Sequence, residues 1–222
     1  MAPIQFGVLE ISYQLLDVGL PVDFLSSCSK DYIRGMEVIG AAPPGLSDKG
    51  IDIDFHYIGL TMEPQVHTAQ YACVPTTTVD NCPKLDYLLI GGPDPATFAN
   101  MDPRWLKFIR ERVPEVKTLF TTCTGGMVAA LAGVLDGVSA TTNHGAIPMA
   151  KQMMPKVDWV ADKQWVVGEG GKFWTAGGAF AGADMFAAWI AEKYGQEVVM
   201  VSNVALDFVP RDVLGKHIVR AQ

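Results

Sequence analysis

The sequence lacks the cysteine pairs and basic clusters that mark several common classes of protein. Its four cysteines, Cys28, Cys73, Cys82 and Cys123, form no C-x-x-C pair and have no metal-type spacing with the four histidines. Neither a zinc site nor a redox dithiol is therefore indicated, and we expect no metal and no cofactor. With 17 Lys and Arg against 24 Asp and Glu, the net charge of -7 disfavours a nucleic-acid partner or an anionic membrane surface.

Long hydrophobic runs are also lacking. No uninterrupted apolar stretch approaches the roughly 18 residues that indicate a transmembrane helix, and no charged segment followed by an apolar run opens the sequence. We therefore expect no membrane contact and a cytoplasmic location. What the chain has is 49% hydrophobic residues in a length of 222, which suffices for one sizeable core. No repeat or linker interrupts it, so we predict a single domain over residues 1–222.

Short apolar runs alternate with helical patterns, which predicts a mostly parallel sheet covered by helices on both faces. The expected elements are strand 4–10, helix 15–25, strand 36–41, antiparallel edge strands within 51–78, strand 87–90, helix 103–113, strand 116–121, helix 127–135, strand 138–142, helix 146–154, a hairpin of 165–167 with 173–175, and helix 181–194. Asp102 is the expected N-cap of helix 103–113, with proline at its first position. The predicted fold is α/β, a flavodoxin-like three-layer sandwich.

Cys123 lies where a predicted buried strand turns directly into a helix, an arrangement called a nucleophile elbow. Thr124, Gly125 and Gly126 follow it, so the N–H groups of a helix N-terminus can point at the sulfur and lower the pKa of the thiol. We also expect the N–H of Thr124 to face that of Gly92 and to bind negative charge that develops on a substrate. A buried structural cysteine is the competing interpretation. The paired glycines favour a nucleophile.

Two further segments are expected at the same edge of the sheet. Ligands bind beyond the carboxyl ends of the strands in such folds, and Gly91 and Gly92 directly follow strand 87–90. Asp17 lies at the start of the helix after the first strand. Its carboxyl could exchange a proton with the thiol if burial raises its pKa. A capping or first-turn acid is the alternative, and composition alone does not choose between the two.

A set of motifs spread over nearly the whole chain resembles the ThiJ/PfpI, or class I glutamine amidotransferase-like, superfamily. The motifs are Leu16-Asp17-Val18 with Pro21 and Asp23, Leu89-Ile90-Gly91-Gly92, Thr122-Cys123-Thr124-Gly125, Ala140-Thr141-Thr142, Thr175-Ala176-Gly177-Gly178 and Ala181-Gly182-Ala183-Asp184. The Cys-Thr-Gly elbow and the Leu-Asp helix start resemble the isocyanide hydratase branch, a hydro-lyase that adds water to an isonitrile and gives an N-substituted formamide. The resemblance implies an enzyme that acts on a small molecule, needs no cofactor and forms a homodimer.

The resemblance also implies roles for individual residues. Cys123 would attack the terminal carbon and form a thioimidate, and Asp17 would handle the proton and the water. Gly92 and Thr124 would contribute the backbone N–H groups around the sulfur, and Gly91 belongs to the same expected binding turn. These five positions form the core of the predicted site.

One departure from the superfamily pattern concerns histidine. Many relatives place a histidine directly after the Ala140-Thr141-Thr142 motif, whereas this chain has Asn143 and then His144. We include His144 among the expected binding residues, because it could still approach the pocket. Two alternative functions remain open. One is a redox-sensing or protective protein with an oxidisable Cys123, and the other is a glyoxalase or deglycase acting on reactive dicarbonyls.

Overall fold

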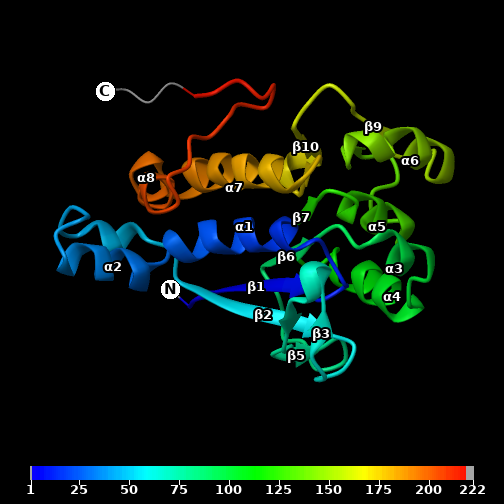
Figure 1. The fold of residues 1–222 in the computed structure, drawn as a ribbon, viewed down its shortest axis with the longest axis horizontal. Helices are drawn as coiled ribbons and strands as arrows, with labels where there is room; N and C mark the ends of the chain where they lie inside the picture. The colour runs from blue at the N-terminus through cyan, green and yellow to red at the C-terminus, as the bar shows by residue number, and fades with distance from the viewer. Residues whose placement is uncertain (1, 219–222) are drawn as a thin grey trace.

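A computed structural model describes residues 2–218, in which a seven-stranded sheet is covered by helices (Figure 1). The strands are β1 (Ile4–Leu9), β2 (Ile53–Gly59), β3 (Gln65–Val66), β4 (Ala72–Cys73), β5 (Thr77–Thr78), β6 (Tyr87–Ile90), β7 (Thr118–Thr122), β8 (Ser139–Ala140), β9 (Asp158–Trp159), β10 (Trp165–Gly168) and β11 (Phe173–Ala176). The α-helices are α1 (Leu15–Ser27), α2 (Lys30–Val38), α3 (Pro95–Ala99), α4 (Pro103–Arg112), α5 (Gly125–Leu131), α6 (Ile147–Met153), α7 (Ala179–Tyr194) and α8 (Gln196–Ala205).

The strand order of the main sheet is β10-β11-β7-β6-β1-β2-β5. Its neighbouring strands pair in parallel except for β10 and β11, which form an antiparallel hairpin at one edge. The chain moves outward in one direction from β1 and in the other from β6, so these two adjacent strands mark the switch point where α/β sheets bind ligands. The predicted α/β sandwich with a mostly parallel sheet is confirmed.

The central strands bury both faces because side chains alternate across a sheet. Phe6 and Leu89 belong to a core shared with α1, α7 and α8, whereas Leu88 and Leu119 belong to a second core shared with α4, α5 and α6. Figure 1 shows α1 and α7 lying side by side over the first of these cores. Each face of the sheet therefore has its own hydrophobic interior.

Phe120 on β7 is fully buried in the first core, with its ring centroid 4.6 Å from that of Phe186 and 5.3 Å from that of Trp189. Phe120→Ala is expected to lower the free energy of unfolding by about 3–5 kcal/mol, because it removes these contacts and leaves a cavity. Urea denaturation measures the difference. The control Val38→Ala alters a side chain that is 82% exposed and is expected to change stability by less than about 0.5 kcal/mol. An equally small effect of Phe120→Ala would contradict the described packing.

Helix α4 begins where the sequence predicts. The Asp102 side chain accepts a hydrogen bond from the N–H of Arg104, and Pro103 is the first helical residue. The longest helix, α7, has 16 residues. Among the described residues, none of the helices combines the length and the apolar character that crossing a bilayer requires.

Two predicted strand regions are wrong. Residues 36–41 continue helix α2 as far as Val38 and then turn at Gly40, where φ is 72°. Val38 and Ile39 are 82% and 73% exposed, so this apolar run is not a buried strand. Within residues 51–78, β2 and β5 run parallel to their neighbours, and the antiparallel pair is the short β3–β4 hairpin. Alternating apolar residues reveal which face of a strand is buried but not the direction in which it pairs.

Candidate active site

The loops that follow β1, β6, β7 and β11 meet at the carboxyl edge of the sheet. Asp17 lies in the first turn of α1, Gly92 follows β6, and Cys123 follows β7. The N–H of Cys123 donates a hydrogen bond of 3.0 Å to the carbonyl of Ala176 at the end of β11. The structure therefore brings the predicted nucleophile, acid and glycine turn together beside the switch point.

Cys123 has the strained backbone of an elbow. Its φ is +52°, in the left-handed region that residues other than glycine rarely adopt. Its carbonyl accepts a hydrogen bond of 2.8 Å from the hydroxyl of Thr142. Helix α5 begins at Gly125, where a Cβ atom would collide with the carbonyl oxygen of Ile90. These contacts hold the sharp turn and leave the Cys123 side chain half-buried at the edge of the sheet.

Asp17 is 1% exposed and lies against Cys123. Its Oδ2 accepts a hydrogen bond of 3.2 Å from the N–H of Gly92, and its carboxyl lies close enough to the Cys123 thiol for each group to shift the pKa of the other. Its Oδ1 has no hydrogen-bond partner among the described residues. Burial raises the pKa of Asp17 to about 6, and the hydrogen bond from Gly92 and the nearby Cys123 thiol offset this only in part. A carboxyl that titrates near neutrality and has an unpartnered oxygen is suited to proton transfer.

The Cys123 thiol departs from the sequence-based expectation. The sequence predicts that a helix N-terminus lowers its pKa, and the N–H of Thr124 does hydrogen-bond to the sulfur. Burial and the charge of Asp17 nevertheless raise the pKa of Cys123 above its usual value, because together they outweigh Thr124 and the Nδ2 of Asn143, which lies 3.6 Å from Sγ. The resting sulfur is therefore a protonated thiol that lies beside the carboxyl of Asp17.

Gly92 acts on the acid rather than directly on the sulfur. The sequence predicts that its N–H faces that of Thr124, but in the structure the N–H of Gly92 is donated to Asp17. A Cβ at this position would lie 2.8 Å from Asp17 Oδ2, from Cys123 Cβ and from the N atom of Thr124. Gly92 is thus the meeting point of the three other residues, and its lack of a side chain permits their contact.

His144 does not reach the sulfur through a described contact. It is exposed, and its Nε2 lies 2.9 Å from the carbonyl oxygen of Lys163. The preceding Asn143 contacts Cys123 instead. This contact is absent from the site predicted from the sequence, where its signal is the departure from the superfamily pattern at position 143. Both residues line a shallow depression of about 380 Å³ that also includes Phe180 and Arg211. Substrate binding by His144 stays a prediction.

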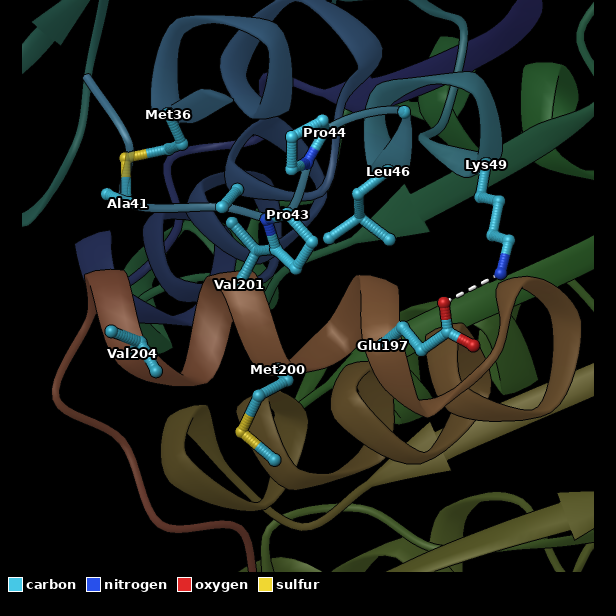
Figure 2. Close-up of a pocket in the computed structure, with 12 residues that line it drawn as sticks. Met36, Ala41, Pro43, Pro44, Leu46, Lys49, Glu197, Met200, Val201 and Val204 are labelled. Carbon is cyan, nitrogen blue, oxygen red and sulfur yellow. Dashed lines mark hydrogen bonds and ion pairs between the residues drawn. The ribbon is translucent and has the colours of Figure 1, made fainter. Parts of the chain in front are cut away.

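A larger apolar depression lies elsewhere, between α2, the 3₁₀ turn Leu46–Lys49 and α8 (Figure 2). Its volume is about 550 Å³. The described residues that line it include no cysteine, and Lys49 and Glu197 pair with each other across 2.7 Å, as the dashed line in Figure 2 shows. This depression lacks the nucleophile and the free acid found at the carboxyl edge. Within residues 2–218, no group of three His, Cys, Asp or Glu side chains is arranged to hold a metal ion.

Comparisons with known proteins agree with the predicted fold and with the resemblance to the superfamily. The family model described as the DJ-1/PfpI family matches residues 28–192. An isonitrile hydratase of Pseudomonas putida is 29% identical over 159 residues, which cover 72% of this chain and 68% of that protein. A ThiJ/PfpI family protein from Pseudomonas syringae has a similar structure, with a TM-score of 0.72 and 20% identity over 95% of this chain and 77% of the other. Drosophila melanogaster DJ-1beta gives a TM-score of 0.67 and 17% identity over 94% and 99%.

Proposed function

The chain belongs to the DJ-1/PfpI family, and from this premise we propose that it is a cysteine-dependent lyase of the isonitrile hydratase type. The reaction adds water to the terminal carbon of an isonitrile and gives an N-substituted formamide. The observation that carries the proposal is the close approach of the buried Asp17 carboxyl to Cys123 at a strained elbow, where both would lie 2.8 Å from a Cβ at Gly92. The likeness to the Pseudomonas putida isonitrile hydratase supports the choice of substrate class.

In the first half of the reaction, Asp17 removes the thiol proton while Sγ of Cys123 attacks the terminal carbon. The S–C bond forms with the sulfur electron pair, and the carbon receives the proton that the thiol lost. The product is a thioimidate, R–N=CH–S–Cys123. The N–H of Thr124 already hydrogen-bonds to the sulfur and stabilises negative charge on it as the proton leaves.

In the second half, a water molecule attacks the thioimidate carbon. The unpartnered Oδ1 of Asp17 is available to accept a proton from this water, and the imine nitrogen gains one proton as the C=N bond becomes single. The C–S bond then breaks, the sulfur leaves with its electron pair, and the hydroxyl proton returns to it through Asp17. The sum is R–NC plus H₂O giving R–NH–CHO, with the thiol and carboxylate regenerated.

The same geometry is less favourable for the two alternatives. A redox-sensing cysteine requires a readily ionised thiol, whereas burial and Asp17 raise the pKa of Cys123. A glyoxalase or deglycase of the superfamily pattern would have a histidine at the position of Asn143, and the Nε2 of His144 is engaged with Lys163. These observations favour the hydration of an isonitrile.

The test incubates the purified protein with an alkyl or aryl isocyanide and follows the absorbance of the formamide. Turnover of isocyanide without turnover of methylglyoxal supports the proposal. Consumption of methylglyoxal alone would assign the dicarbonyl chemistry instead. Stoichiometric peroxide uptake at Cys123 with neither substrate turned over would assign the sensor role.

Gly92→Ala is expected to lower the turnover of isocyanide roughly 10- to 100-fold, because the added Cβ separates Asp17 from Cys123. The matched control is Gly19→Ala on α1, where a Cβ meets nothing within 4 Å, and this variant is expected to behave as the wild type. Steady-state kinetics of both variants check the prediction. Full activity of Gly92→Ala would show that the close approach is not required.

The assembly and the location of the protein remain predictions. The resemblance implies a homodimer with the elbow near the interface, and the exposed apolar side chains Leu16 and Phe180 lie near the site, on α1 and α7. Light scattering coupled to size-exclusion chromatography measures the mass in solution. A cytoplasmic location is the corresponding proposal for the cell.

A further inference from the structure

A buried polar cluster lies behind the β1–α1 turn, outside the site described above. The side chains of Glu10 and His67 are both 0% exposed, and Glu10 Oε2 lies 2.8 Å from His67 Nε2. The hydroxyl of Tyr13 lies 3.2 and 3.3 Å from the two carboxyl oxygens of Glu10. The charge of Glu10 contributes, after burial, to raising the pKa of the nearby Cys73 thiol, and the Tyr71 ring lies 6.1 Å from that of His67.

The hydrogen bonds assign the proton on His67. The backbone N–H of Tyr13 donates to Nδ1 at 3.3 Å, so Nδ1 is the acceptor and the ring proton is on Nε2. That proton is then donated to Glu10. The Tyr13 and His67 rings also stack, with centroids 3.8 Å apart. Each polar atom of the imidazole ring thus has a partner, and one of the two partners is the backbone of the β1–α1 turn.

His67 lies in the loop of the β3–β4 hairpin, and the next residue of that loop, Thr68, holds further residues of the β1–α1 turn. The N–H of Thr68 donates to the carbonyl of Tyr13 at 3.2 Å, and the Thr68 hydroxyl accepts from the N–H of Leu15 at 3.0 Å. Leu15 is the first residue of α1, two positions before Asp17. On the opposite side of the turn, the N–H of Gln14 donates to the carbonyl of Gly92 at 2.9 Å.

We propose that His67 and Thr68 are positioning residues: anchored by Glu10, they hold the β1–α1 turn so that the carboxyl of Asp17 meets the thiol of Cys123. Buried polar groups that are fully hydrogen-bonded specify one arrangement, whereas an apolar contact would let the turn shift. Neither residue touches the sulfur in a described contact, so both act through the turn. The inference rests on the proposed function where turnover of isocyanide is measured. It does not rest on it where the reactivity of Cys123 toward an alkylating agent is measured.

The test uses variants that separate the contacts. In His67→Gln the amide nitrogen can still donate to Glu10, but the acceptor for the Tyr13 N–H is lost. In His67→Asn the amide oxygen takes the place of Nδ1 and keeps that acceptor. Thr68→Val removes the acceptor for the Leu15 N–H at nearly constant volume. Val66→Ala on the same hairpin alters a side chain that is 53% exposed and is the matched control.

The first readout is the rate of alkylation of Cys123 by iodoacetamide as a function of pH, resolved by peptide mass spectrometry. Cys28 is 0% exposed and reports general unfolding in the same experiment. We expect His67→Gln and Thr68→Val to lower the midpoint of Cys123 alkylation by about one pH unit, because the charge of Asp17 moves away from the sulfur. His67→Asn keeps the acceptor for the Tyr13 N–H but loses the bond to Glu10, so it is expected to shift the midpoint less than His67→Gln does. Val66→Ala is expected to match the wild type, with Cys28 protected throughout.

The second readout is isocyanide turnover. His67→Gln and Thr68→Val are expected to lower kcat roughly 10- to 100-fold while KM stays within about twofold, because misplacement affects the proton transfer more than binding. Combining Thr68→Val with Asp17→Asn is expected to add no further shift to the Cys123 midpoint.

The proposal is overturned if Thr68→Val and His67→Gln leave the Cys123 profile unchanged. It is also overturned if Cys28 becomes equally reactive, because His67 and Thr68 would then support the whole fold rather than Asp17. Should His67→Gln fail to fold, Thr68→Val alone decides. If the wild type turns over no isocyanide, the proposed function fails, and the alkylation profiles still decide whether the hairpin positions Asp17.

Discussion

Cys123→Ser is expected to lower kcat/KM for an isocyanide by at least roughly 10³-fold, to the background of the assay. A serine hydroxyl fits the half-buried position but is far less acidic than a thiol, so Asp17, with its pKa of about 6, cannot generate the nucleophile from it. No covalent thioimidate then forms, and the water step has no substrate. Steady-state kinetics with the purified variant measure the loss.

The control for this variant is Cys82→Ala, because Cys82 is buried in the second core and its thiol faces the carbonyl of Pro83 rather than the elbow. This variant is expected to retain wild-type turnover, although it can lower stability. More than a tenth of the wild-type rate in Cys123→Ser would refute a covalent role for the sulfur. Mass spectrometry of wild-type protein mixed rapidly with isocyanide should detect the adduct at Cys123.

Asp17→Asn is expected to lower kcat by roughly 10²- to 10³-fold, the usual contribution of a general acid and base. An asparagine oxygen can still accept the hydrogen bond from the N–H of Gly92, so the local fold is retained while proton transfer is lost. Asp23→Asn alters an exposed acid on the same helix and is the matched control. Retention of more than a tenth of the wild-type kcat in Asp17→Asn would contradict the proposed proton transfer.

The same substitution is expected to make Cys123 more reactive toward an alkylating agent at pH 8. The charge of Asp17 beside the thiol raises the pKa of Cys123, so removing it lowers that pKa and increases the thiolate fraction. Slower turnover together with faster alkylation would show that the variant has lost a base while the site around Cys123 keeps its structure.

The dependence of kcat/KM on pH shows whether Asp17 acts in its ionised form. The carboxyl must be ionised to accept the thiol proton, so kcat/KM of the wild type is expected to fall about tenfold per unit as the pH drops below about 6. Asp17→Asn should abolish this limb. A wild-type rate that is independent of pH between 4 and 7 would be incompatible with the assigned base.

Residues that begin or end a helix or strand explain which elements could be predicted from the sequence. Strand β6 (Tyr87–Ile90) matches its predicted limits because the apolar run ends abruptly at Gly91. Helix α4 likewise starts at the predicted residue, after Asp102. The segment 36–41 has a similar apolar content but no such signal at its start. Its first residues belong to α2, a helix that was not predicted from the sequence, and Val38 and Ile39 lie at the surface.

The site was predictable where function lies next to a turn and unpredictable where it depends on contacts across the fold. Cys123 and Asp17 each follow a recognisable strand end, so their meeting at one edge could be inferred. The contact of His67 with Tyr13 joins residues 54 positions apart, and no local sequence pattern predicts it. The direction in which the pKa of Cys123 shifts depends on burial and on the distance to Asp17. Spacing in the sequence specifies neither of them.

The two hydrophobic interiors of this sheet have a consequence for how the protein tolerates change. The acid is carried by α1, whose apolar residues pack in one interior, and the sulfur precedes α5, whose apolar residues pack in the other. Repacking on either side is therefore expected to move one of these two helices relative to the other. Substitutions deep within either layer should therefore impair turnover as well as stability, so variation through evolution should be restricted on both sides of the sheet at once.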